Sequence, residues 1–122
     1  MGLWFIRIAV VYLFAGALLG LVMGITQRFT LVPVHAHVLL LGWASLALAG
    51  VVYHLYPAAS RTRLARLHFW LHNAGLPVFM IGLGLVLSGT ASLLPVVAAA
   101  AVIVVIGLAL FALNVLVNAK AT

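Results

Sequence analysis

Residues 31–57 read LVPVHAHVLLLGWASLALAGVVYHLYP and form a long apolar stretch with a proline near each end. A helix needs about 20 predominantly apolar residues to cross the hydrocarbon core of a bilayer. Pro33 suits the first turn of such a helix, where its missing N–H costs little, and Pro57 suits its end. The stretch therefore predicts a transmembrane helix over 32–56.

Three more stretches of similar length and hydropathy flank this one, at about 3–26, 65–89 and 93–118. The chain has 122 residues, of which 68% are hydrophobic and 5% charged, and its mean hydropathy is +1.40. A soluble domain carries about 25% charged residues. We therefore expect an all-α integral membrane protein, with residues 1–122 forming a single four-helix transmembrane domain.

The basic residues are distributed unequally between the two ends of these helices. One end carries Arg7, Arg61, Arg63, Arg66 and Lys120, and the other end carries Arg28. Because cytoplasmic loops of membrane proteins are enriched in Lys and Arg, both termini are predicted to be cytoplasmic. We expect a multi-pass protein of the bacterial inner membrane whose His-x-His sequence lies near the external face.

The composition excludes several kinds of chemistry. The chain has no Asp or Glu, which excludes a carboxylate general base, a di-iron carboxylate site and a calcium site. It has no Cys, which excludes disulfides, iron–sulfur clusters and covalently attached c-type haem. Its six basic residues form no single patch, so we expect no nucleic-acid partner. Five histidines remain as the main polar chemistry.

Two of these histidines, His35 and His37, are two residues apart near one end of the second span. Successive helical positions turn by about 100°, so the two rings are expected to point to opposite sides of the helix. One chain then does not clamp a single metal ion between them, and His72 lies at a different depth. We expect His35 of one copy to face His37 of the next, with a haem in each interface between protomers.

Three motifs carry a family resemblance: His35-Ala36-His37, Leu41-Gly42-Trp43 and Tyr53-His54-Leu55-Tyr56-Pro57. They resemble the catalytic subunit of heme-copper oxidases, most closely the cbb type. The run 67–71, with Gly75, is similar to the start of the helix that follows in that family. The first and last spans agree with the family in hydrophobicity and order.

The resemblance implies a fold and a set of roles. It implies that His35 binds a high-spin haem and His37 a low-spin haem, with haem b as the cofactor. That family's twelve helices form three arcs of four, so a chain resembling one arc implies a homotrimer. We expect Trp43 of the shared motif and Arg28 to contact the haem, Arg28 through the propionates; a simple loop charge is the alternative for Arg28.

The chain also departs from that family. It lacks the family's copper-ligand helices, the tyrosine crosslinked to a copper ligand, and the charged residues of the proton channels. An oxygen-reducing proton pump is therefore not expected, and whether the chain is an enzyme stays open. Electron transfer or gas binding is expected instead, with an unknown redox partner.

The remaining histidines, His54, His68 and His72, form a second tier toward the cytoplasmic end. His68 and His72 share one helix face, since they are four residues apart. A second metal or haem site is one interpretation of this tier, and anchoring at the membrane interface is the simpler one. We also expect Asn73, Asn114 and Asn118 to link helices by hydrogen bonds.

Two other functions are compatible with the sequence. One is a haem-free membrane module that binds copper or zinc, since imidazole suits both ions. The other is a structural or assembly subunit of a larger oxidase-like complex that holds no cofactor of its own. The absorption spectrum of the purified protein distinguishes the haem protein from both.

Overall fold

The computed structural model describes residues 1–121, and these contain helices and no strand. The elements, in chain order, are α1 (Gly2–Thr26), α2 (Val32–His37), the π-helix η1 (Val38–Ala44), α3 (Ser45–Leu55), α4 (Pro57–Ser60), α5 (Arg63–Leu87), the 3₁₀ turn η2 (Ala91–Leu93) and α6 (Leu94–Asn118). Four continuous helical stretches are long and apolar enough to cross a membrane: Gly2–Thr26, Val32–Leu55, Arg63–Leu87 and Ala91–Asn118. The prediction of an all-helical protein with four membrane-spanning helices is confirmed.

Prolines mark the helix ends where the sequence indicates. Pro33 lies in the first turn of α2 and Pro95 in the first turn of α6. Pro57 begins the short helix α4, directly after the second span ends. Pro77 lies inside α5, which nevertheless continues to Leu87.

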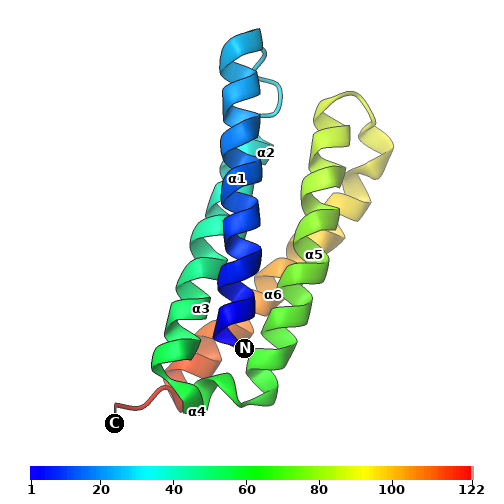
Figure 1. Cartoon of the computed structure of the whole chain (residues 1–122). Helices are drawn as coiled ribbons and strands as arrows, with labels where there is room; N and C mark the ends of the chain where they lie inside the picture. The colour runs from blue at the N-terminus through cyan, green and yellow to red at the C-terminus, as the bar shows by residue number, and fades with distance from the viewer. Residues whose placement is uncertain (122) are drawn as a thin grey trace.

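The helices form two pairs, as Figure 1 shows. α1 packs along η1 and α3, and α5 packs along α6. Both termini lie at the end of the bundle that carries α4, and toward the opposite end the two pairs diverge. A cavity of about 600 Å³ lies at this diverging end, lined from α1, the α1–α2 turn and the end of α5.

Two clusters of buried side chains hold the pairs together. The cluster near the termini contains Phe5, Ala9, Leu46, Ala49, Tyr53, Ala59 and Ala65. The other contains Val34, Val38, Leu76, Met80 and Val104. The backbones of α1 and α3 approach closely near the first cluster, since a Cβ on Gly2 would lie 2.6 Å from the carbonyl oxygen of Gly50, as is typical of helix packing in membranes.

The second span differs from the uniform α-helix that its sequence predicts. Residues Val38–Ala44 form a π-helix, in which each N–H donates to the carbonyl five residues earlier. The backbone N–H and the hydroxyl of Ser45 both donate to the carbonyl of Leu40. Gly42 faces the ring of Tyr12 so closely that a Cβ there would collide with it. The wider turn is thus held by its neighbours, which no periodicity in the sequence reveals.

Candidate functional site

His35 lies against α1, in a groove made by two glycines. Its Nδ1 lies 2.9 Å from the carbonyl oxygen of Gly16. A Cβ on Gly20 would lie 2.7 Å from the Cε1 atom of His35, so the missing side chain gives the ring its place. The ring is half-buried and is fixed to α1 by one polar contact and by close packing.

His37 lies on the other side of the same helix. Its Nδ1 lies 2.7 Å from the carbonyl oxygen of Pro33, one turn earlier. Its ring meets Phe79 of α5 edge-on, with ring centroids 5.3 Å apart. The two rings of the His-x-His sequence therefore contact different helices, and neither lies beside the other.

The carbonyl partners fix the protons of both rings. A carbonyl oxygen only accepts hydrogen bonds, so Nδ1 is the protonated nitrogen in His35 and in His37. In a neutral imidazole the lone pair is then on Nε2. Neither Nε2 atom has a hydrogen-bond partner within residues 1–121. Each ring thus presents one unshared electron pair, the group that binds a metal ion.

Trp43 and Arg28, the residues predicted to contact the haem with these histidines, lie on η1 and in the turn after α1. Trp43 lies on η1 and packs against the buried cluster around Phe5. Arg28 lies in the turn after α1 and lines the cavity at the diverging end, together with Met23 and Ser88. Gln27, just before it, adopts a left-handed conformation with φ of 55°, which reverses the chain after α1.

The structure brings His68 and His72 together in a buried hydrogen-bonded chain. The hydroxyl of Tyr53 lies 3.1 Å from Nδ1 of His68, and Nε2 of His68 lies 3.3 Å from Nδ1 of His72. Nε2 of His72 lies 2.8 Å from the carbonyl oxygen of Leu41. Both imidazoles are fully buried, and Tyr53 is 2% exposed.

The carbonyl of Leu41 sets the direction of every bond in this chain. It only accepts, so Nε2–H of His72 donates to it and Nδ1 of His72 is the acceptor. Nε2–H of His68 then donates to His72, which leaves Nδ1 of His68 to accept from the Tyr53 hydroxyl. Both imidazoles are neutral in this arrangement, and every ring nitrogen has a partner. A charged imidazole would cost far more at this depth in a bilayer.

His54 stays apart from this pair, so the three histidines of this tier do not meet within residues 1–121. It is exposed on α3, whereas His68 and His72 face the bundle interior. The interpretation of His68 and His72 as anchors at the membrane interface is wrong, because fully buried rings do not reach lipid headgroups. Within residues 1–121, no three His, Cys, Asp or Glu side chains gather closely enough to hold a metal ion.

The asparagines only partly link the helices. Asn114 is fully buried; its Nδ2 donates to the carbonyl of Ala59, and its Oδ1 accepts from the Thr62 hydroxyl and from Asn118. It thus joins α6 to α4 and to the turn before α5. Asn73 and Asn118 bond only within their own helices. Among residues 1–121, Oδ1 of Asn73 is the one buried side-chain oxygen or nitrogen without a partner.

Sequence reasoning missed two members of the buried chain, Tyr53 and the Leu41 carbonyl. Tyr53 gives a weak signal: it lies two residues before the end of the second span, where interfacial tyrosines are common, but a buried hydroxyl usually finds a polar partner. The Leu41 carbonyl gives no such signal, because its role depends on the π-helix.

Compared with protein-family models, curated proteins and solved structures, the chain matches none of them. The resemblance of its histidine motifs to heme-copper oxidases therefore rests on the motif residues alone.

Proposed function

We propose that the chain is a membrane b-type haem protein in which His35 and His37 bind haem iron through Nε2, for electron transfer or for binding a small gas. One observation carries this proposal: both rings donate Nδ1–H to a main-chain carbonyl. Histidines that ligate metals characteristically donate their other ring N–H to a carbonyl or carboxylate. The bond to the carbonyl orients the ring and raises the basicity of the ligating nitrogen.

The chemistry of the donor set fits haem. Neutral imidazole is a common axial ligand of haem iron, and the absence of Cys favours a haem held without covalent attachment. When bound, the haem supplies a one-electron redox centre, or an open iron position if only one imidazole binds. The protein contributes the ligands, their fixed orientation and surroundings that contain no acidic side chain.

We propose further that each haem lies between protomers. His35 packs against α1 and His37 against α5, so the pair in one chain is not arranged to share one iron. Ligation by His35 of one protomer and His37 of the next satisfies both rings in a closed ring of copies. The number three comes from the family resemblance, as does the place of Trp43 beside the cofactor.

The role of Arg28 and the orientation of the chain in the membrane belong to the same proposal. Arg28 carries the one basic side chain at the diverging end of the bundle and would neutralise the haem propionates there. By the positive-inside rule, we propose that this end faces outside and that both termini are cytoplasmic, in a bacterial inner membrane.

Haem content tests the proposal, with His37→Ala as the variant and His54→Ala as its matched control. His54 lies in the same span, but its side chain is exposed and makes no hydrogen bond within residues 1–121. Purified wild-type protein and His54→Ala should be red, with a Soret band and sharp bands in the reduced spectrum, and His37→Ala should lose most of the haem. Equal haem in all three proteins would refute the ligand assignment. A colourless preparation that retains copper or zinc would select the haem-free metal module, and one with neither would select the structural subunit.

A further inference from the structure

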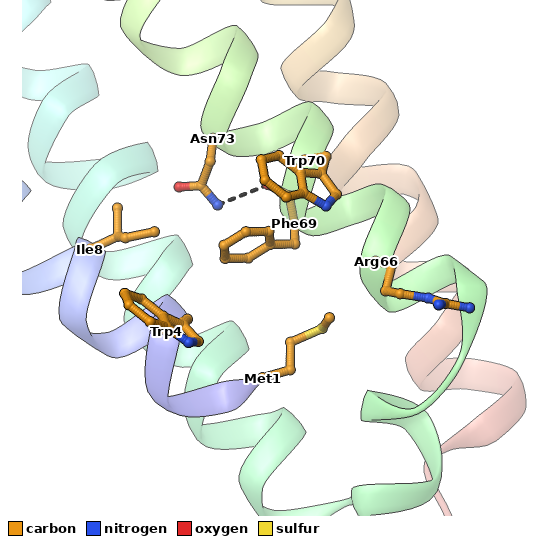
Figure 2. A pocket seen from close by; sticks show the side chains of 7 residues that line it. All are labelled: Met1, Trp4, Ile8, Arg66, Phe69, Trp70 and Asn73. Carbon is orange, nitrogen blue, oxygen red and sulfur yellow. Dashed lines mark hydrogen bonds between the residues drawn. The ribbon is translucent and has the colours of Figure 1, made fainter.

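A second cavity, of about 550 Å³, lies between α1 and α5 near the end that holds both termini. Trp4 and Ile8 line it from α1, and Phe69 and Trp70 line it from α5 (Figure 2). Trp4 is 58% exposed and Trp70 is 67% exposed, so the cavity opens to the outside of the bundle between two indole rings. Its walls are almost entirely apolar.

Arg66 adds the one charged side chain to this lining. It lies in the first turns of α5, one helical turn before Trp70, and so at the end of the cavity nearest the helix terminus. Arg7 does not line the cavity, but its guanidinium carbon lies 5.2 Å from the centroid of the Trp4 ring. The cavity is therefore apolar along the helices and positively charged at its rim.

No acidic side chain of the protein can pair with these arginines. The chain has six Lys and Arg residues and no Asp or Glu. A second copy of the chain would likewise bring no Asp or Glu side chain to this place. An anion that carries hydrocarbon would match both the exposed guanidinium of Arg66 and the apolar walls.

We propose that this cavity binds an anionic phospholipid, with its phosphate on Arg66 and an acyl chain lying along Trp4, Phe69 and Trp70. A guanidinium matches phosphate oxygens in geometry as well as charge. Tryptophans are enriched at the level of lipid headgroups, where one edge of the indole is polar and the rest apolar. Basic pockets between transmembrane helices on the cytoplasmic side recognise anionic headgroups in this way.

Tryptophan fluorescence in nanodiscs tests the proposal, because Trp4 and Trp70 report directly from the cavity walls. The full-length protein is placed in two series of phosphatidylcholine nanodiscs. One series contains increasing mole fractions of brominated phosphatidylglycerol, and the other contains the same mole fractions of brominated phosphatidylcholine. We expect the brominated anionic lipid to quench at roughly fivefold lower mole fraction, the factor that corresponds to one basic residue at an anionic surface. Trp70→Phe should remove a large part of this selective quenching.

The control is a charge change that spares the cavity. Arg66→Gln should bring quenching by the two lipids to near equality, whereas Arg61→Gln, in the exposed turn before α5, should leave the preference intact. Equal quenching by both lipids in the wild-type protein would overturn the proposal, as would a preference that survives Arg66→Gln. Little quenching by either lipid would show that another protein surface covers the cavity. Reversal by millimolar inorganic phosphate would indicate a site for free anions instead.

Discussion

Nε2 of His72 donates its proton to the main-chain carbonyl of Leu41, 2.8 Å away and on a different transmembrane helix. Because of this bond, Nδ1 of His72 accepts from Nε2–H of His68, and Nδ1 of His68 accepts from the Tyr53 hydroxyl. It also ties α5 to the π-helix that follows the His-x-His sequence. The buried chain is thus a structural link between the proposed haem ligands and the third span.

His72→Leu should destabilise the protein strongly. The change removes the acceptor of the Nε2–H of His68, a buried donor whose loss of a partner costs about 1–3 kcal/mol, and it removes one hydrogen bond from the Leu41 carbonyl. His72→Gln should recover part of the loss, because an amide both donates and accepts. Thermal unfolding in detergent, followed by helical circular dichroism, measures both variants; a His72→Leu protein as stable as the wild type would contradict the directed chain.

Asn114→Leu should lower the free energy of unfolding by about 2 kcal/mol. Its amide bonds to the Ala59 carbonyl and to the Thr62 hydroxyl, and each would lose one hydrogen bond, worth about 1 kcal/mol, while the two oxygens, 2.9 Å apart, still bond to each other. Asn118→Leu is the matched control, since Asn118 is only half-buried and bonds to Asn114 alone. If the two variants unfold at the same temperature, Asn114 does not hold α6 to α4.

The four spans follow from the sequence because a bilayer demands length and hydropathy, and both are visible in residue order. The opposite directions of His35 and His37 follow from helical geometry in the same way. The Tyr53–His68–His72 chain does not, because it joins residues of different helices through a carbonyl whose position depends on the π-helix. The separation of His54 from that chain was also hidden: depth along a helix is readable from residue number, but the face each helix presents to its neighbour is not.

Two variants that each bind little haem should bind haem again in mixed oligomers, if the two ligands of an iron come from different protomers. His35→Ala and His37→Ala alone should each bind little haem. In oligomers formed from equal amounts of both, a seam between protomers keeps both ligands when one chain supplies His35 and its neighbour supplies His37. In a trimer that contains both variants, one of the three seams keeps both ligands, so mixed trimers should hold about a third of the wild-type haem.

The measurement needs co-expression with two different affinity tags, so that only mixed oligomers are purified. Haem per protein is then compared with the same two variants mixed after purification as separate oligomers. Haem in the co-expressed sample and none in the late mixture supports ligation across a seam. Absence of haem from verified mixed oligomers would show that both ligands of an iron come from one chain.

Gly20→Ala should weaken the His35 site, whereas Gly24→Ala should not. A Cβ on Gly20 would lie 2.7 Å from Cε1 of His35, closer than real contacts allow, and would push the ring away from the Gly16 carbonyl. A Cβ on Gly24, one turn later on the same helix, would meet nothing within 4 Å. Alanine is intrinsically better than glycine in a helix by about 1 kcal/mol, so Gly24→Ala should be neutral or stabilising.

The two variants share the same chemical change on the same helix, so their difference isolates the ring of His35. We expect Gly20→Ala to unfold at a lower temperature than Gly24→Ala and to retain less haem after purification. Displacement of the ring also takes Nδ1 away from the carbonyl that orients it. Gly20→Ala should therefore lose more haem than Asn114→Leu loses for the same drop in unfolding temperature. Equal stability and equal haem in the two glycine variants would mean that His35 does not occupy the glycine groove of α1.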